Sequence, residues 1–367
     1  MKPVARLVGG LLLALLAAMS LLVLAEAGLR VAGRVGGGAW PRTRAAEFYD
    51  QVLLLRSICR DHPFLNTAPR PGAAAVVFGK SAALNRLGYR SPERPRAKPP
   101  GVRRVVAAGG STTFDVLADD NGATWPSRLE ERLRASGRPV EVWNAGFPGW
   151  TTLESLISLA IRDVDLAPDV VLLYHAVNDL QPASHEPFDP QYDGGHAGIS
   201  RKALGLDLPP PSWLDRLLLV ERLRGLAGGP SDPWQALAVK GSGRRRERIG
   251  EAGIAAFERN VRSFVALAGS RGATVVLMTQ PLRLRAAHRE ADLAHLAGWY
   301  PELDPAAAPH EIARLNDVLR RLGAEGVGEL ADVARDIPWT DEDFGDPVHY
   351  AAPGREKLVG YLAPRIP

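Results

Sequence analysis

The residues with the clearest chemical potential lie in four short motifs that are widely spaced along the chain. In order, these motifs are Gly109-Gly110-Ser111-Thr112, Asn144-Ala145-Gly146, Ala176-Val177-Asn178-Asp179 and Asp346-Pro347-Val348-His349. A serine hydroxyl attacks an acyl carbon only when a base removes its proton, another group orients that base, and hydrogen-bond donors meet the oxyanion that forms. The four motifs contain a residue of the right type for each of these tasks.

Three of the four motifs follow stretches whose composition predicts buried β-strands. Residues 103–108, 140–143 and 169–174 are short apolar runs that end just before these motifs. A pair of glycines permits a tight turn that leaves Ser111 at the carboxyl end of the first strand. Because ligands bind beyond the carboxyl ends of parallel strands, we expect the three motifs to face one crevice.

In these motifs and in their order, the chain resembles the SGNH/GDSL hydrolases, a family of esterases. The resemblance implies that Ser111 is the nucleophile, His349 its general base, and Asp346 the carboxylate that holds the imidazole in the correct tautomer. It also implies an oxyanion hole formed by the backbone N–H groups of Ser111 and Gly146 together with the side-chain amide of Asn178.

The resemblance covers residues 101–367 and points to the membrane-anchored bacterial type of this family. Two positions depart from the family pattern: Gly110 stands where Asp is usual, and Ala176 stands where Gly is usual. Residue 110 is not itself catalytic, and a methyl group at residue 176 needs only an ordinary backbone conformation. We therefore expect both departures to leave the chemistry intact.

Elements outside the motifs indicate an α/β fold. Apolar periodicity predicts helices and strands in alternation, namely helices over 125–134, 153–162, 257–268 and 312–322 and strands over 274–279 and 327–330. Such alternation implies a parallel sheet that helices cover on both faces. The family resemblance adds a flavodoxin-like strand order, and thus a three-layer α/β/α architecture.

The N-terminus predicts a membrane-spanning helix. Lys2 and Arg6 precede an uncharged apolar run over 7–25, about the length that crosses a hydrocarbon core and longer than the apolar region of a secretory signal. We predict a signal anchor over 1–34 that holds a periplasmic or extracellular enzyme at the membrane. Ala25-Glu26-Ala27 offers a cleavage site, so the alternative is a secreted enzyme released after signal cleavage.

The rest of the chain divides into a connecting segment with a linker over 35–100 and a hydrolase domain over 101–367. Within this domain, composition changes over 181–250, where an apolar pattern at 213–226 predicts one amphipathic helix. An insertion after the strand end that carries Asn178 would hang over the crevice, so we interpret it as a lid. A surface insertion is the alternative.

Composition narrows the possible partners. The chain has 45 Lys and Arg against 41 Asp and Glu, but the basic residues are scattered and no nucleic-acid motif is recognisable, so we expect no nucleic-acid partner. The single cysteine, Cys59, permits no intrachain disulfide. The histidines form no metal-binding spacing with other ligand types, so we predict no metal and no cofactor. His175 is expected to pack at a strand end, with a place in the lining of the pocket as the alternative. Asp115, Asp119 and Asp120 are expected to lie in a solvated loop, with substrate contact as the alternative.

The predicted function is that of a serine ester hydrolase acting on small-molecule or carbohydrate-linked acyl esters in the cell envelope. An O-acetyltransferase of an envelope polysaccharide would use the same acyl-enzyme and differ only in its acceptor. A catalytically silent polysaccharide-binding domain is the alternative of a different class. Sequence leaves open the acyl chain length, the alcohol half of the substrate and the oligomeric state.

Overall fold

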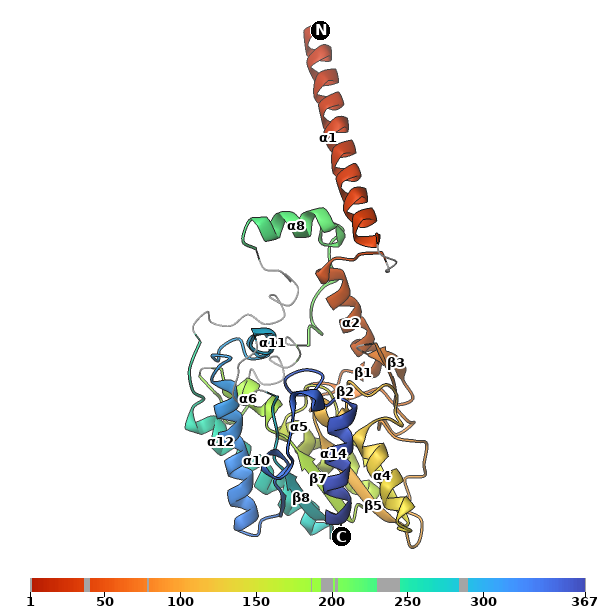
Figure 1. Cartoon of the computed structure of the whole chain (residues 1–367), viewed down its shortest axis with the longest axis vertical. Coiled ribbons are helices and arrows are strands. Elements are labelled where there is room, and N and C mark those ends of the chain that lie inside the picture. Colours follow the sequence, from red (N-terminus) through yellow and green to blue (C-terminus); the bar gives the residue numbers. More distant parts are fainter. Residues whose placement is uncertain are drawn as a thin grey trace. The chain divides into compact units, whose positions relative to one another are not determined.

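A computed structural model describes residues 2–35, 40–77, 79–185, 187–192, 201, 204–229, 245–283 and 290–366 (Figure 1). Contacts divide the chain into two compact units. Met1–Val52 and Asp207–Ala238 form the first, which we call the N-terminal unit. Leu53–Leu206 and Val239–Pro367 form the second, which we call the sheet unit and which contains all four motifs.

The centre of the sheet unit is a five-stranded parallel sheet. Its strands are β5 (Arg103–Gly109), β6 (Val140–Asn144), β7 (Val170–Tyr174), β8 (Thr274–Met278) and β9 (Glu329–Ala331). They lie side by side in the order β6-β5-β7-β8-β9, with every neighbouring pair parallel. This is the flavodoxin-like order, in which the second strand along the chain sits at one edge. The predicted fold class is confirmed.

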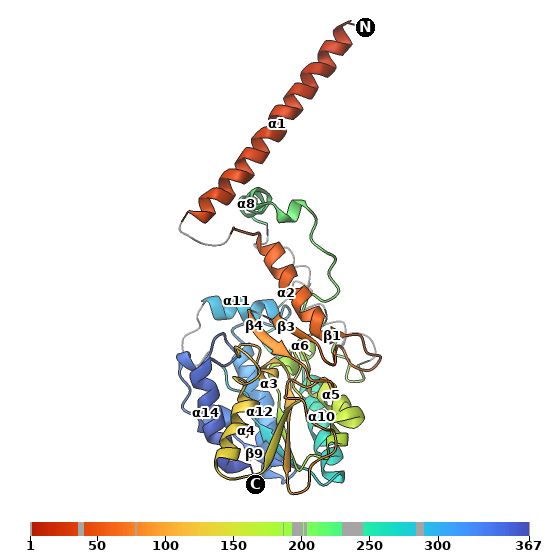
Figure 2. The same ribbon diagram turned by 90° about the vertical axis from the view of Figure 1, so that its right-hand side faces the viewer.

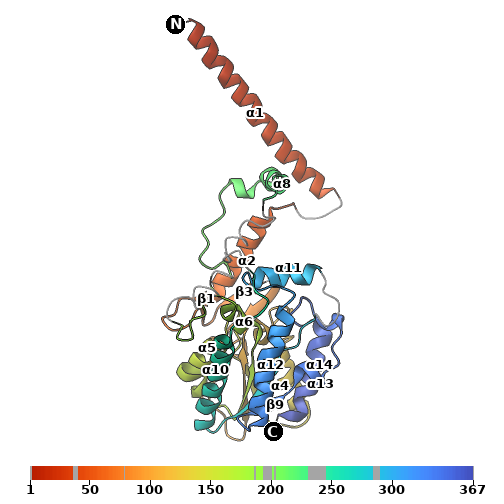
Figure 3. The same cartoon turned by 90° about the vertical axis from the view of Figure 1, so that its left-hand side faces the viewer.

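Helices cover both faces of this sheet (Figures 1 and 3). One face packs against α5 (Thr152–Ser158), α10 (Glu251–Ser270) and α12 (Ala308–Ala324), and the other against α4 (Trp125–Ala135) and α14 (Ala352–Leu362). Because successive strand side chains point to opposite faces, Leu173 lies in the first core and Leu172 in the second.

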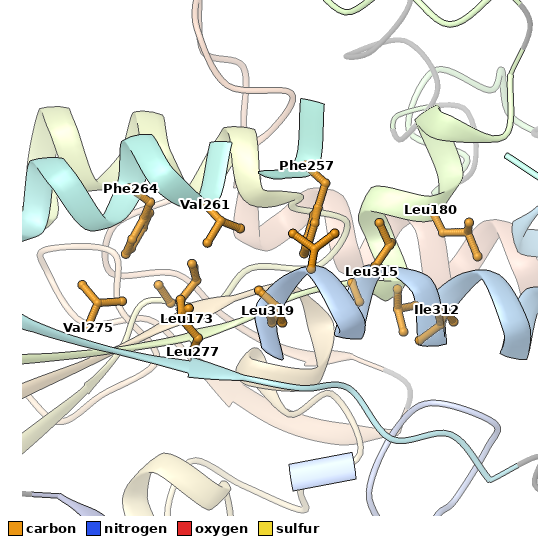
Figure 4. Packing of buried hydrophobic residues seen from close by; sticks show 14 of the residues in the cluster. Leu173, Leu180, Phe257, Val261, Phe264, Val275, Leu277, Ile312, Leu315 and Leu319 are labelled. Atoms are coloured by element: carbon orange, nitrogen blue, oxygen red, sulfur yellow. The ribbon is translucent and has the colours of Figure 1, made fainter. Parts of the chain in front are cut away.

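Figure 4 shows the first core from close by. Phe257, Val261 and Phe264 of α10 point toward Leu173 and Leu277 of the sheet. The predicted apolar faces of α10 and α12 are therefore the faces that the structure buries. Leu180, from the short helix α6 (Val177–Ala183), joins the same cluster and so fixes the element that carries Asn178.

Local sequence signals account for the ends of these helices. The backbone N–H of Thr151 donates to the Glu154 carboxylate at 2.8 Å, which completes a capping box at the start of α5. After Ser158, the predicted helix continues as a π-helical turn, Leu159–Asp163, in which the Asp163 carboxylate accepts from Ser158 and Tyr89.

The segment before the first sheet strand contains regular structure. It includes α2 (Arg44–Ile58) and two antiparallel pairs, β1 (Cys59–Arg60) with β2 (Ala68–Pro69) and β3 (Ala74–Val77) with β4 (Lys80–Ala83). Ile58 and Leu84 pack in one buried cluster with Phe114 and Trp150. Arg90 is buried and donates to the backbone carbonyl oxygens of Phe114 and Asp115. From residue 53 onward, the predicted connecting segment therefore packs into the sheet unit.

The remaining described elements of the sheet unit lie around the carboxyl ends of the strands and at the far edge of the sheet. They are α3 (Ser111–Phe114), α11 (Glu290–Trp299) and α13 (Val333–Asp336). Figure 2 shows α3 between the sheet and the strands β3 and β4. The Ser81 backbone N–H donates to Asp119 O, which ties β4 to the loop that follows α3.

The N-terminal unit contains the long helix α1 (Lys2–Arg34) and the short helix α8 (Leu218–Leu226), which follows a 3₁₀ turn, Leu214–Arg216. Val8–Arg34 is long and apolar enough to cross a membrane, as a signal sequence also is. Figures 2 and 3 show α8 beside the C-terminal end of α1. Within the predicted lid over 181–250, α8 thus contacts α1, whereas Leu206 and Ile249 pack in the cores of the sheet unit. The proposed role of the lid over the crevice stays a prediction.

Candidate active site

Ser111 begins α3 immediately after β5, and two glycines make this position possible. A Cβ atom on Gly109 would lie 2.0 Å from Thr113 Oγ1, and one on Gly110 would lie 2.3 Å from Asn178 Nδ2. No side chain fits at either residue without displacing its neighbours. Glycine at residue 110, the first departure from the family pattern, therefore brings the Asn178 amide against the turn that carries Ser111.

The serine, histidine and aspartate that the sequence singles out are connected by hydrogen bonds. His349 Nε2 lies 2.8 Å from Ser111 Oγ, and His349 Nδ1 lies 2.7 Å from Asp346 Oδ2. The second carboxylate oxygen, Asp346 Oδ1, accepts from the backbone N–H groups of Val348 at 2.9 Å and His349 at 2.8 Å. The carboxylate thus holds both the ring and the backbone of His349.

The electrostatic surroundings keep Asp346 ionised. Burial opposes its charge, but the charge of His349, the hydrogen bond from the His349 ring, the charge of His295 and the Val348 N–H outweigh that penalty. Together they hold the pKa of Asp346 well below its usual range. An ionised acceptor at Nδ1 keeps the ring proton there and leaves Nε2 free to accept the serine proton.

Asn178 and Ala176 lie beside the serine as expected. Asn178 Nδ2 donates one of its two hydrogens to the carbonyl oxygen of Trp150 at 2.8 Å. This hydrogen bond fixes the orientation of the amide and leaves its second N–H as a further donor. Ala176 has a φ of 171°, which is extended backbone open to any residue. The second departure from the family pattern therefore introduces no backbone strain.

Gly146, whose N–H is expected in the oxyanion hole, lies against α3. Its N–H donates to Asn144 Oδ1 at 3.0 Å, and a Cβ on it would lie 2.4 Å from the backbone nitrogen of Phe114. This glycine is needed because the chain passes against α3, but its N–H already has a partner.

Gly149, three residues further on, has a φ of +79° and precedes Trp150, whose carbonyl oxygen binds Asn178. Within the described residues, the N–H groups of Ser111 and Gly149 have no hydrogen-bond partner. Sequence reasoning missed Gly149. Its only signal was the second glycine of Asn-Ala-Gly-Phe-Pro-Gly.

A buried ion pair connects the serine and histidine segments. Asp115 follows α3 with a left-handed φ of 66° and accepts from Arg355 Nε at 2.8 and 2.9 Å and from the Trp125 N–H at 2.9 Å. Arg355 lies in α14, just after His349. The expectation that Asp115 belongs to a solvated loop is wrong, since only 2% of it is exposed.

The other two aspartates of that loop are exposed, as expected. Asp119 forms an ion pair with Lys80, and Asp120 accepts from the backbone N–H of Ala123 at 2.9 Å. Neither contacts the predicted catalytic residues in the described structure. Asp115 differs because its carboxylate pairs with the buried Arg355, whereas Asp119 and Asp120 lie at the surface.

A small cavity of about 10 Å³ lies beside Ser111 and is lined by His175, Asn178 and Gln280 among others. His175 Nε2 lies 2.8 Å from Ser155 Oγ, and burial lowers the pKa of His175 to about 3. The ring is therefore neutral and packs at the end of β7, as expected. Gln280, which sequence reasoning missed, donates from Nε2 to the Tyr174 hydroxyl at 2.9 Å.

The loop that carries Asp346 and His349 is also held by residues outside the four motifs. The Arg283 N–H donates to the Pro347 carbonyl oxygen at 3.0 Å, while its guanidinium pairs with Asp292 of α11. Across the described ranges, no cluster of three or more His, Cys, Asp or Glu side chains is placed to hold a metal ion.

Comparison with known proteins identifies the class. The sequence profile of the GDSL-like lipase/acylhydrolase family matches residues 107–357, which span β5 to α14. The chain belongs to this family and is an ester hydrolase. No curated protein sequence matches the chain.

Solved structures to which this chain is similar include a lipase/acylhydrolase from Enterococcus faecalis, with 19% identity, a TM-score of 0.42, and coverage of 72% of this chain and 95% of that one. A GDSL-like lipase from Bacteroides thetaiotaomicron has 14% identity, a TM-score of 0.40, and coverage of 72% and 87%. The acetyl xylan esterase AlAXEase has 14% identity, a TM-score of 0.41, and coverage of 72% and 100%.

Proposed function

We propose that this ester hydrolase uses Ser111, His349 and Asp346 as a catalytic triad and acts on acyl esters in the cell envelope. The observation that carries the proposal is the position of His349, 2.8 Å from Ser111 Oγ on one side and 2.7 Å from Asp346 on the other. A nucleophile within hydrogen-bond reach of a base that is itself oriented by a carboxylate is the arrangement that activates a serine.

In the proposed reaction, Ser111 Oγ bonds to the ester carbonyl carbon while His349 Nε2 takes the hydroxyl proton. The tetrahedral oxyanion then collapses, the bond to the alcohol oxygen breaks, and His349 returns its proton to that oxygen. Water, deprotonated by His349, attacks the resulting acyl-enzyme and releases the acid and free Ser111. Asp346 stays ionised throughout and stabilises the charged imidazole.

We propose that the oxyanion meets the N–H of Ser111, the Asn178 side chain and the N–H of Gly149, rather than the N–H of Gly146. The Gly146 N–H is engaged by Asn144, whereas that of Gly149 lacks a partner in the described structure. The test is a crystal structure of the Ser111 adduct with a phosphonate. Its oxygen should lie 2.7–3.1 Å from the Gly149 nitrogen. An oxygen bound to Gly146, with Asn144 displaced, would reverse this assignment.

We propose that the substrate carries a short acyl group, because the described residues leave only a small cavity beside Ser111. Its volume of about 10 Å³ is close to that needed for a single water molecule, far below the 300 Å³ or more typical of ligand pockets. Acetyl esters should be hydrolysed best, and kcat/KM should fall as the chain lengthens from acetyl through butyryl to octanoyl. An optimum at octanoyl would contradict the proposal of a short acyl chain without affecting the triad.

The acceptor of the acyl group separates the hydrolase from the first alternative. An O-acetyltransferase would pass the same short acyl group to a sugar hydroxyl, so product analysis with and without an oligosaccharide acceptor is the discriminating experiment. A fluorophosphonate probe tests the silent-domain alternative, because it labels only an activated serine. The wild-type protein should be labelled and Ser111→Ala should not.

We propose that α1 is retained as a membrane anchor with the enzyme on the outer side. The possible cleavage site, Ala25-Glu26-Ala27, lies within continuous helix, and the Glu26 carboxylate accepts from backbone N–H groups of α8. Cleavage would remove these contacts. The full-length protein should stay in the membrane fraction after a carbonate wash. A soluble mature chain that begins near Gly28 would show signal cleavage instead.

A further inference from the structure

We propose that residues 213–226 of the N-terminal unit form an interfacial segment that lies on the membrane surface next to α1. The segment binds a lipid surface that contains anionic headgroups. It contacts the lipid through the apolar side of α8 and through the turn that precedes α8. The proposal rests on the proposed retention of α1 as an anchor, and it assigns the central part of the insertion a place in the membrane interface.

The first observation is a set of contacts that holds α8 to one point on α1. Glu26 accepts from the N–H groups of Leu218 and Leu219 at 3.1 and 2.9 Å, so an α1 carboxylate binds the first residues of α8. Arg30 donates to Glu26 at 2.8 Å and to the Arg216 carbonyl oxygen at 2.9 Å. Three hydrogen bonds therefore fix where α8 begins relative to α1, and the bond from Arg30 to Glu26 within α1 holds the two side chains that make them.

The second observation is the position of Glu26 relative to the hydrocarbon core that α1 would cross. Glu26 is the first charged residue after the apolar run over 7–25. This run of about 19 residues is roughly 28 Å long as a helix, close to the ~30 Å of a hydrocarbon core. Glu26 therefore lies where α1 leaves the hydrocarbon, and α8 begins at that same level. Figure 1 shows α8 extending across the direction of α1, as a segment parallel to the membrane surface would.

The third observation is exposed apolar surface on this segment. Trp213 is 71% exposed, Leu223 54% and Leu226 86%, and no residue of α8 is buried. Leu219, Leu223 and Leu226 follow the spacing that puts side chains on one helix face. A short amphipathic helix with a tryptophan at its edge suits the boundary between headgroups and acyl chains.

The fourth observation is charge. Arg216 and Arg222 are exposed and have no side-chain partner among the described residues. Arg34, at the end of α1, lies over the Trp40 ring with 4.5 Å between guanidinium carbon and ring centroid. Cations beside an apolar helix face favour anionic headgroups. The exposed cations and the exposed apolar surface therefore both favour a membrane surface with anionic headgroups as the partner.

The lone cysteine makes a direct test possible. Cys59 is buried, and burial raises the pKa of its thiol to about 12, so spin labels should react only with introduced cysteines. Full-length Leu226→Cys and Gly225→Cys would be labelled in nanodiscs of phosphatidylcholine and phosphatidylglycerol. Both residues are exposed, and a Cβ atom on Gly225 would meet no other atom within 4 Å, so neither change should affect folding. The label at residue 226 should be reached by oxygen more readily than by a water-soluble nickel chelate. The label at residue 225, which points away from the apolar face, should be reached more readily by the nickel chelate.

Leu16→Cys in α1 separates failure of this proposal from failure of the anchor. A lipid-exposed label at residue 16 with a water-exposed label at 226 overturns the interfacial segment and leaves the anchor intact. A label at 226 that neither reagent reaches shows a protein partner, a second copy or the sheet unit, and also overturns it. Water-exposed labels at both residues overturn both proposals.

Discussion

The two units of this chain both shield an ion pair from solvent, but they differ in where they place their apolar side chains. In the sheet unit, the buried pair Asp115 and Arg355 lies among apolar cores and connects the segments that carry Ser111 and His349. In the N-terminal unit, Glu26 and Arg30 form a part-buried pair on α1, while Leu226 of α8 is 86% exposed. The sheet unit excludes water to position charges. In the N-terminal unit, charged side chains hold a segment whose apolar surface faces outward, and exposed apolar surface is typical of sites that bind a membrane or a protein.

The largest expected effect tests whether the chemistry belongs wholly to the sheet unit. Ser111→Ala and His349→Ala should each lower kcat for a short-chain ester by on the order of 10⁴- to 10⁶-fold, because each removes an essential partner in proton transfer. The double variant should be little worse than either single one. Membrane association should not change in any of them. Wild-type hydrolysis by Ser111→Ala, free of contaminating esterases, would refute the site.

The next effect tests the role of the buried carboxylate. Asp346→Asn should keep the fold but let the amide donate to Nδ1, which puts the His349 proton on the wrong nitrogen. We expect kcat to fall by on the order of 10⁴-fold with a much smaller change in KM. The exposed Asp119→Asn is the matched control and should keep full activity. Equal losses in both variants would mean that the defect is not one of tautomer.

A third prediction compares a buried with an exposed ion pair that also involves α14. Asp115→Ala leaves Arg355 buried without its carboxylate and should cost about 3–5 kcal/mol in the free energy of unfolding. Glu356→Gln breaks the exposed pair with Arg128 and should cost at most about 1 kcal/mol. Denaturant unfolding measures both. Similar small costs would show that the connection between the serine and histidine segments is not important for stability.

The smallest effect concerns pH. Burial lowers the pKa of His175 from its usual 6.5 to about 3, so between these values the unfolded chain binds a proton that the folded chain does not. Stability contributed by neutral His175 is therefore present above pH 6.5 and is lost as pH falls toward 3. His175→Gln should reduce the loss of unfolding free energy between pH 7 and pH 4.5 by on the order of 2 kcal/mol. Ser155→Ala removes the hydrogen bond but keeps the histidine, so it should keep the wild-type slope.

Local signals predicted the strands of the sheet because these depend on short segments, and the family resemblance added their order. The resemblance also singled out Ser111, His349 and Asp346, which the structure connects by hydrogen bonds. The strand before Ser111 is recognisable from its apolar run, and the spacing from Asp346 to His349 lets one carboxylate bind both ring and backbone within a single turn. Local sequence signals do not indicate whether the N–H of Gly146 is free to bind the oxyanion. Which N–H group is free depends on the Asn144 side chain, and a residue type does not reveal such a contact.

Contacts between distant segments were the part that sequence did not reveal. The residues after 52 pack against Phe114 and Trp150, although their composition resembled a connection. Asp115 appeared solvated because its partner, Arg355, lies 240 residues away. A single sequence carries no signal for such a pair. The arrangement of the fold brings them together, so both required the structure.

The proposed nucleophile and base stand at opposite ends of the sheet unit's chain, 238 residues apart, and His349 precedes only the final helix. A chain still emerging from the ribosome or passing through a translocation channel has its serine but lacks its base. The proposed site is therefore complete only after the segment that carries His349 has been delivered and α14 has packed against α4. With the proposed membrane topology, this assembly takes place outside, so crossing the membrane would also activate the enzyme.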